Sequence, residues 1–213
     1  MVMRDILLAE YTGGHVHIAH MSTGCSAACV REGKRRGVRV TCEVTPHHIA
    51  LTHAAVEGYD TDAKMNPPLR PEEDRAALVE ALADGTVDAI ATDHAPHQVD
   101  EKCVEFSVAP FGVVGLETAV SVCLDRLVHA RVLPLSRLVA LFTTGPAAVL
   151  RLRKGTLRPG ADADVTVLDL EREVKVDPAA FRSKSRNTPF RGWRLRGAPI
   201  LTIVSGRVIH DAR

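Results

Sequence analysis

Short apolar segments alternate with amphipathic segments through the first two-thirds of the chain. Apolar and β-branched runs bounded by turn signals predict strands over residues 15–20, 38–44 and 87–92. Apolar residues at helical spacing predict helices over 26–36, 72–83, 116–130 and 135–142, with a short helix near 146–150. Because strands and helices alternate, we expect parallel strands joined by right-handed crossovers, which is an α/β fold.

The first twelve residues have the pattern of the last turns of a helix. Ile6, Leu7 and Tyr11 fall on one side, and Gly13-Gly14 ends the helix as a C-terminal glycine does. No cap or strand precedes this helix. We therefore expect that a longer protein continues upstream of Met1.

The pattern changes at Lys154-Gly155. Residues 163–170 and 195–210 are rich in β-forming residues, with turn signals at 197–199 and 205–206, and they predict a small antiparallel sheet. Only three or four strands fit before residue 155, whereas a complete eight-stranded barrel takes about 250 residues. The α/β part is either a small open sheet or part of a barrel, and the periodicity does not choose between them.

Composition and charge limit the partners and the location. The chain has 213 residues, 46% apolar and 25% charged, with a formal net charge of +1. This balance argues against binding to nucleic acid or to an anionic membrane, and no apolar run approaches the roughly 20 residues of a membrane span. The five cysteines are an odd number, and Cys25 and Cys29 share a predicted helix face, which suits buried thiols better than zinc or a disulfide. We expect a reducing, cytoplasmic compartment.

Candidate chemistry follows the strand at 87–92. Asp93 comes directly after this strand, within Ala91-Thr92-Asp93-His94-Ala95-Pro96-His97. Parallel α/β folds build active sites at the carboxyl ends of their strands, where an aspartate can ligate a metal or move a proton. The ordinary alternative is that Asp93 caps the following turn. Two histidines and a rigid Ala-Pro beside it favour the chemical role.

His20 occupies the same place on another strand, as the last residue of 15–20. An imidazole there is a natural zinc ligand. Strand alternation puts His20 and Ile18 on one face, with His15 and His17 on the other. For a lone histidine a structural role would be favoured, but the matching position of Asp93 favours a ligand.

Two further segments carry polar groups. Glu43-Val44-Thr45-Pro46-His47-His48 spans the end of the strand at 38–44 and the residues after it. Its adjacent histidines point in different directions, so we expect at most one to face the site. Asn66 lies in the proline-bounded stretch Lys64-Met65-Asn66-Pro67-Pro68-Leu69-Arg70. Its amide could bind a ureido or carboxylate group, although a turn residue is the common explanation.

Together these segments resemble the dihydroorotase family of the amidohydrolase superfamily. The matching pieces are HIAHMST, EVTPHH, KMNPPLR, ATDHAPHQVDEK, APFGVVGLET and NTPFRGWRLRGAPILTIVSGRVI, and the likeness extends from Arg4 to His210. ATDHAPH followed by Lys102 is the most specific; allantoinases and hydantoinases share its Asp-His but usually differ in the Ala-Pro-His and in NPPLR. The resemblance implies a fold of the α/β class: residues 1–153 would form the C-terminal portion of a (β/α)8 TIM-type barrel, about strands six to eight, and 154–213 a β-rich, sandwich-like appendage.

The resemblance implies part of a metal site. His20 would be a zinc ligand from the sixth barrel strand, and Asp93, after the eighth, would be both a zinc ligand and the catalytic acid and base, in a site for one or two zinc ions. The family's His-x-His pair, its bridging carboxylate or carbamylated lysine and its fifth-strand histidine have no counterpart here. His15-Val16-His17 has the spacing of the missing pair, but it lies at the wrong end of its strand and faces away from His20.

The resemblance also implies the substrate contacts. Asn66 and His97 would bind the substrate, and backbone groups at Phe111 and Gly112 would close on its ring. The reaction would be the reversible, zinc-dependent interconversion of N-carbamoyl-L-aspartate and (S)-dihydroorotate in pyrimidine biosynthesis. We expect no appreciable activity from this chain alone, since two ligands do not hold a zinc ion.

Two alternatives stay open at this stage. One is a non-catalytic dihydroorotase-like subunit that assembles with aspartate transcarbamoylase, and the other is a hydantoinase or allantoinase type of relative. The intact ligand positions His20 and Asp93 favour an active parent enzyme. The sequence leaves open a homodimer, and the expected ligand is a small molecule.

Overall fold

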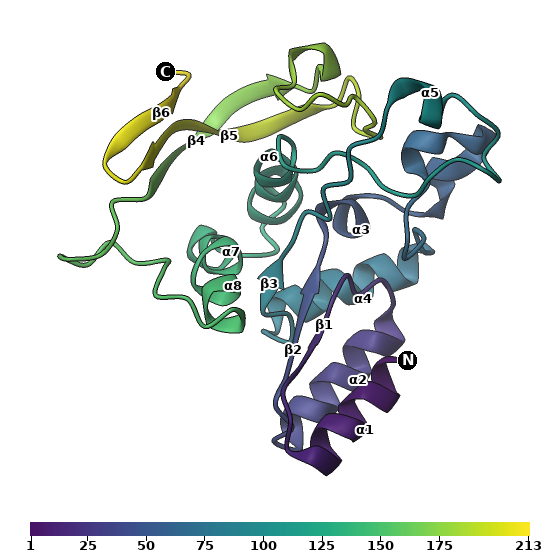
Figure 1. Cartoon of the computed structure of the whole chain (residues 1–213), viewed down its shortest axis with the longest axis vertical. Helices are drawn as coiled ribbons and strands as arrows, with labels where there is room; N and C mark the ends of the chain where they lie inside the picture. The colour runs from purple at the N-terminus through teal and green to yellow at the C-terminus, as the bar shows by residue number, and fades with distance from the viewer.

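The computed structural model describes residues 1–213 (Figure 1). Its first sheet has three short strands, β1 (Val16–Ile18), β2 (Val40–Val44) and β3 (Ala89–Ile90), hydrogen-bonded in that order and all parallel. Each strand falls inside a segment predicted from the sequence. The mixed α/β class with parallel strands is therefore confirmed.

Three longer helices connect and cover these strands: α1 (Val2–Thr12), α2 (Gly24–Arg35) and α4 (Glu72–Ala83) (Figure 1). In α1 only part of the predicted apolar side is buried: Ile6 is, whereas Leu7 is 48% exposed and Tyr11 90% exposed. A close approach explains why Ile6 differs, because a Cβ on Gly33 of α2 would lie only 2.9 Å from its Cγ2 atom. Gly33 thus lets α1 and α2 pack tightly.

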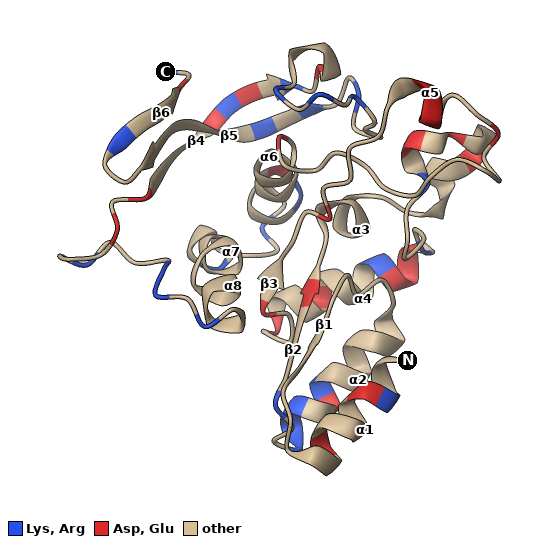
Figure 2. Cartoon of the chain, in the orientation of Figure 1, with Lys and Arg blue, Asp and Glu red and all other residues tan.

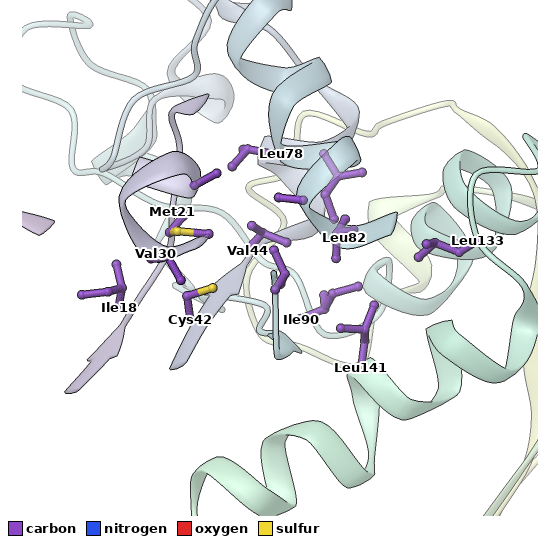
Figure 3. Close-up of a cluster of buried hydrophobic side chains, with 14 of the residues drawn as sticks. Ile18, Met21, Val30, Cys42, Val44, Leu78, Leu82, Ile90, Leu133 and Leu141 are labelled. Carbon is purple, nitrogen blue, oxygen red and sulfur yellow. The ribbon is translucent and has the colours of Figure 1, made fainter. Parts of the chain in front are cut away.

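A core of 22 buried residues joins the sheet to the helices, and Figure 3 shows a part of it. Val44, Leu78 and Leu82 have no exposed surface. Burial of such a side chain stabilises the fold by about 1.5–3 kcal/mol. Along β2 burial alternates, so Cys42 and Val44 enter this core while Glu43 faces the other side of the sheet.

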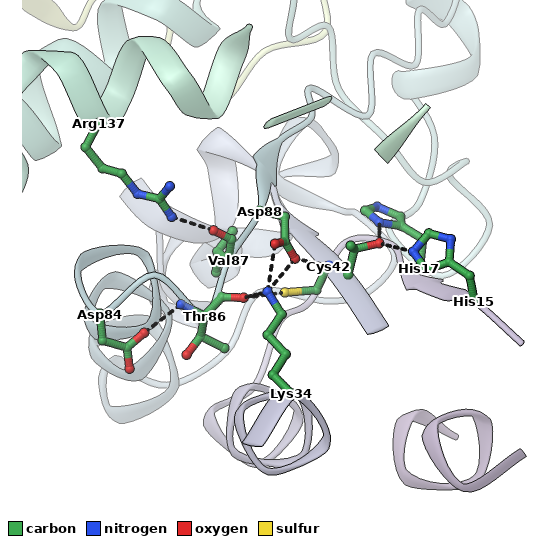
Figure 4. Close-up of polar contacts among 10 residues, drawn as sticks. His15, His17, Lys34, Cys42, Asp84, Thr86, Val87, Asp88 and Arg137 are labelled. Atoms are coloured by element: carbon green, nitrogen blue, oxygen red, sulfur yellow. Dashed lines mark hydrogen bonds and ion pairs between the residues drawn. The ribbon is translucent and has the colours of Figure 1, made fainter. Parts of the chain in front are cut away.

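A polar network ties α2 to the sheet near the start of β3 (Figure 4). The Lys34 ammonium donates to both carboxylate oxygens of Asp88 at 2.7 Å and to the Thr86 carbonyl at 2.7 Å. Asp88 also accepts the backbone N–H of Cys42 at 2.8 Å. These bonds connect elements about fifty residues apart and stabilise the register of β2 and β3.

Shorter helical elements fill the connections. They are α3 (Pro46–Ala50), η1 (His53–Tyr59), η2 (Thr61–Ala63), α5 (Val99–Lys102), α6 (Ala119–Cys123), η3 (Leu124–His129, a π-helix), α7 (Leu135–Phe142) and α8 (Thr144–Val149). The helix predicted over 116–130 begins three residues later. The backbone N–H of Gly115 donates instead to His94 Nδ1 at 3.1 Å, and that of Val114 to the Asn187 carbonyl at 2.9 Å. These bonds hold the preceding segment in a loop.

The second sheet is antiparallel, in the order β4 (Val165–Lys175), β5 (Arg194–Val204) and β6 (Arg207–Asp211), with η4 (Pro178–Ala180) between the first two. The predicted turn at 205–206 is confirmed, because Ser205 and Gly206 both have positive φ and join β5 to β6. The predicted turn at 197–199 is wrong. Gly197, at φ 97°, lies inside β5 opposite an irregularity of β4, and Leu124 packs where its Cβ would be.

Charges of both signs are interleaved along α2 and along β4, whereas the charged residues of β5 are arginines (Figure 2). Arg35 pairs with Glu32, and Arg196 pairs with Glu171. None of the helices combines the length and the apolar character needed to cross a bilayer. A second buried cluster, which includes Val113, joins the antiparallel sheet to the loops that follow β2 and β3.

Candidate active site

The candidate site lies where β1, β2 and β3 end. His20 follows β1 by two residues, Glu43 is the fourth residue of β2, and Asp93 follows β3 by three. His20 and Asp93 both have left-handed backbones, with φ 51° and φ 48°. Such a conformation costs energy in residues other than glycine and often occurs at functional sites.

The three side chains converge. His20 Nε2 lies 3.7 Å from Asp93 Oδ1, and His20 Nδ1 lies 2.7 Å from Glu43 Oε1. The second contact is short but bent away from the Nδ1–H direction, so it is an ion-pair contact rather than an aligned hydrogen bond. His17 Nε2 donates to the other oxygen of Glu43 at 3.2 Å. Glu43 therefore lies between two imidazoles.

Strand alternation placed His17 on the face opposite to His20, and the structure corrects this. The chain leaves β1 after Ile18, so His20 no longer follows the alternation and reaches the same carboxylate as His17. Both ring nitrogens of His17 are engaged, because Nδ1 also contacts Thr41 Oγ1 at 2.8 Å (Figure 4). His15 Nε2 contacts the same hydroxyl at 3.0 Å. His15 and His17 are thus engaged by side chains of β2.

The electrostatics of this group follow from burial and contact. Burial alone would raise the pKa of Glu43, but the contacts with His17 and His20 outweigh it and lower that pKa to about 2. The contact with Glu43 raises the pKa of His20; burial opposes this rise and the Asp93 charge adds to it. The sequence analysis assigned no role to Glu43. The signal that could have identified it is an acidic residue between the apolar residues Cys42 and Val44 near the end of a predicted strand.

The two histidines after β2 differ in their contacts. Both are buried. His48 accepts the Thr45 hydroxyl at Nδ1 (2.8 Å) and donates from Nε2 to the Pro67 carbonyl (2.9 Å), so it supports the loop that carries Asn66. Burial lowers the pKa of His48 to about 4 and that of His47 well below its ordinary value. His47 Nε2 has no hydrogen-bond partner.

The expected substrate contacts form a second group. The His97 Nε2–H donates to the Phe111 carbonyl at 2.8 Å, so these two segments lie together. Gly112 has φ +111°, and a Cβ there would lie 2.5 Å from that of Ala95. The Gly112 N–H donates to the Lys64 carbonyl at 2.9 Å, which joins this loop to the exposed Asn66 two residues further on.

His94 and Lys102, the other members of the ATDHAPH segment and its continuation, have structural contacts. His94 Nδ1 accepts the backbone N–H of Gly115. The buried Lys102 ammonium donates to the carbonyls of Pro110 (2.9 Å) and Gly112 (3.1 Å).

The donor set suits a metal only in part. A tetrahedral zinc ion with bonds of about 2.1 Å separates two ligands by about 3.4 Å. His20 Nε2 and Asp93 Oδ1, at 3.7 Å, have a spacing compatible with one shared ion, and Glu43 behind His20 resembles the outer carboxylates that orient ligating histidines. No group of three or more His, Cys, Asp or Glu side chains in this chain is arranged to hold a metal.

The site thus consists of residues at the strand ends of a parallel α/β sheet. Residues 2–209 match the amidohydrolase family, and the chain belongs to that family. Within it the chain is similar to dihydroorotases, as its sequence segments predicted. It is 60% identical to the dihydroorotase of Pelotomaculum thermopropionicum over 213 residues, which are 100% of this chain and 50% of that protein. It is 59% identical to a dihydroorotase of Anaeromyxobacter dehalogenans, covering 99% of this chain and 49% of that protein.

Solved structures of hydantoinases have a similar fold. The L-hydantoinase (dihydropyrimidinase) of Arthrobacter aurescens superposes with a TM-score of 0.94 at 33% identity, covering 99% of this chain and 48% of that one. The D-hydantoinase (dihydropyrimidinase) of Thermus sp. has a TM-score of 0.92 at 27% identity, covering 100% and 48%. The chain thus spans about half the length of the relatives it matches.

Proposed function

We propose that this chain is the C-terminal half of a zinc-dependent dihydroorotase, which interconverts N-carbamoyl-L-aspartate and (S)-dihydroorotate in pyrimidine biosynthesis. The observation that carries the proposal is the 3.7 Å approach of His20 Nε2 to Asp93 Oδ1 at two strand ends, with Glu43 behind His20. Residues 1–153 would belong to the barrel, about strands six to eight, and 154–213 would be the β-rich appendage. The remaining metal ligands would come from elsewhere in the complete protein.

Each residue of the group has a physical task in this proposal. Zinc, as one ion or two, would polarise the scissile carbonyl and lower the pKa of water when bound. Glu43 holds His20 so that Nε2 points toward Asp93. The Asp93 carboxylate would take a proton from the attacking water and deliver it to the departing amide nitrogen, and in ring closure it would work in reverse.

The proposed substrate contacts are supported by two groups that hydrogen-bond to each other in the chain without substrate. The His97 Nε2–H and the Phe111 carbonyl form a hydrogen bond at 2.8 Å. A ligand with a carboxylate and a ring N–H can replace both halves of this bond, since the carboxylate accepts from His97 and the N–H donates to the carbonyl. Asn66, in the adjoining loop, would bind a further carbonyl or carboxylate. Dihydroorotate has all of these groups.

A chimera tests the proposal. The N-terminal half of the Pelotomaculum thermopropionicum dihydroorotase, joined to this chain, should bind zinc and convert dihydroorotate, and Asp93→Ala in the chimera should abolish turnover. This chain alone should neither bind stoichiometric zinc nor show turnover, because two ligands are too few. Enzyme-like turnover by the chain alone would refute the shared site. Zinc binding by the chimera without turnover would favour a non-catalytic subunit, for which binding to aspartate transcarbamoylase is the next assay.

The hydantoinase fold suggests a second candidate function, hydrolysis of hydantoin-type rings, because the L-hydantoinase superposes with a TM-score of 0.94. The 60% identity to a dihydroorotase favours our proposal. Offering both substrates to the chimera separates the two. A preference for the ring without a carboxylate would favour the hydantoinase. Gel filtration of the same chimera would show whether it forms a homodimer.

We also propose a cytoplasmic location for the protein, since all five cysteines are free thiols.

A further inference from the structure

One side chain from the C-terminal part of the molecule reaches the loops after β3. Asn187 lies in the segment 181–193 between η4 and β5, here called the C-terminal loop, and is 5% exposed. Its Oδ1 accepts the backbone N–H of His97 at 3.2 Å. Its Nδ2 donates to the carbonyls of Ala95 at 2.9 Å and Gly112 at 3.1 Å. One amide thus joins the segment of His97 to that of Gly112.

The orientation of this amide is determined by its partners. Two of them are carbonyl oxygens, which only accept hydrogen bonds, and the third is an N–H, which only donates. An Asn187 turned by 180° would oppose acceptor to acceptor and donor to donor. The main-chain carbonyl of Asn187 adds a fourth bond, from the Val114 N–H at 2.9 Å.

We propose that Asn187 is a positioning residue of the substrate site. Its amide, together with the hydrogen bond from the Ala95 N–H to the Val113 carbonyl at 2.9 Å, holds the two segments that carry the His97–Phe111 pair at a constant spacing. The inference rests on the proposed function, because it assigns Asn187 to the substrate contacts expected there. By this inference the C-terminal loop takes part in substrate recognition, although none of its residues need touch the substrate.

Two buried lysines hold residues 106–112, the segment that leads to Gly112, through its carbonyl groups. Lys64 Nζ donates to the carbonyls of Phe106 (2.6 Å), Ser107 (3.1 Å) and Ala109 (2.6 Å), and Lys102 Nζ donates to that of Gly112 at 3.1 Å. Lys64 thus connects residues 106–109 to the chain that follows η2, and Lys102, at the end of α5, connects Gly112 to that helix. Asn187 alone among these three side chains also binds the His97 segment.

The competing explanation is that Asn187 only attaches the C-terminal loop to the rest of the molecule. The structure offers a matched control for this. Glu117 accepts the backbone N–H groups of Arg182 (2.8 Å) and Ser183 (3.0 Å), so it attaches the same loop without contacting His97 or Gly112. If attachment is all that matters, loss of Glu117 should resemble loss of Asn187.

The test compares Asn187→Asp and Asn187→Ser with the control Glu117→Ala. Asn187→Asp keeps the shape and the oxygen that accepts the His97 N–H, but its second carboxylate oxygen would repel the carbonyls of Ala95 and Gly112. The side chain of Asn187→Ser is too short to form any of the three bonds. Hydrogen exchange is measured in this chain, and KM and kcat for dihydroorotate are measured in the chimera. For both Asn187 variants we expect exchange over 95–97 and 111–114 to be faster by about tenfold and KM to rise by about tenfold, with kcat changed by less than about threefold. Glu117→Ala should change neither quantity by more than about twofold.

Several outcomes overturn the inference. Equal effects of Glu117→Ala and the Asn187 variants would reduce Asn187 to an attachment residue, and so would unfolding of both Asn187 variants by circular dichroism. Unchanged exchange and KM would show that the spacing does not depend on this amide. If the unsubstituted chimera has no turnover, the proposed function fails separately, and the exchange measurement still decides whether Asn187 positions the two segments.

Discussion

The carboxylate of Glu43 provides a quantitative test of the site's electrostatics. Glu43→Gln keeps the size of the side chain but removes the charge between His17 and His20. The contacts with these histidines lower the pKa of Glu43 from 4.5 to about 2, and its side chain is only 14% exposed, so solvent screening is modest. The difference corresponds to about 3 kcal/mol of stability, to order of magnitude.

The sign of the pH dependence follows from the two shifts. A lowered carboxyl pKa stabilises the fold fully above the unfolded value of 4.5 and loses this effect as the pH falls toward 2. The raised pKa of His20 stabilises the fold below 6.5 and loses this effect as the pH rises through the folded value. The cluster should therefore contribute most between about pH 4.5 and 6.5.

Urea unfolding of this chain, in the presence of a metal chelator, measures the effect. The free energy of unfolding of the unsubstituted chain minus that of Glu43→Gln should shrink by about 2 kcal/mol between pH 5 and pH 3. Glu171→Gln is the control, because it removes a carboxylate from an exposed ion pair with Arg196. A difference that stays constant within about 0.5 kcal/mol over this range would refute the reasoning.

Three further predictions concern the loop, the core and the metal ligands. Gly112→Ala should destabilise the chain by about 1–3 kcal/mol in urea unfolding, because φ is +111° and the new Cβ would lie 2.5 Å from that of Ala95. The control Gly37→Ala, at φ +80° with no atom within 4 Å, should destabilise the chain less. Equal losses of stability would contradict the steric argument. Leu78→Ala should cost about 2–5 kcal/mol in the same assay, since Leu78 is fully buried, and a loss below about 1 kcal/mol would contradict its place in the core. In the chimera, Asp93→Ala should weaken zinc binding by isothermal titration while circular dichroism stays unchanged; unaltered affinity would remove Asp93 from the ligands.

Local signals in the sequence predicted the elements that depend on nearby residues. The helices at 72–83 and 135–142 occur with the predicted bounds, and the predicted hairpin turn at 205–206 is present. Prediction failed where distant contacts override propensity. Gly197 lies within a strand because Leu124 packs against it, and the helix expected from 116 starts at 119 because His94 and Asn187 bind the backbone before it.

The candidate site divides in the same way. The sequence alone placed His20 and Asp93 at the carboxyl ends of two predicted strands, although both strands end two residues earlier than predicted. Only the tertiary structure brought His17 and His20 to Glu43, and Asn187 to His97. These contacts join residues that are 23 to 90 positions apart in the chain. Periodicity reports which face of its own element a residue occupies, whereas the partner it meets depends on how the strands and loops assemble.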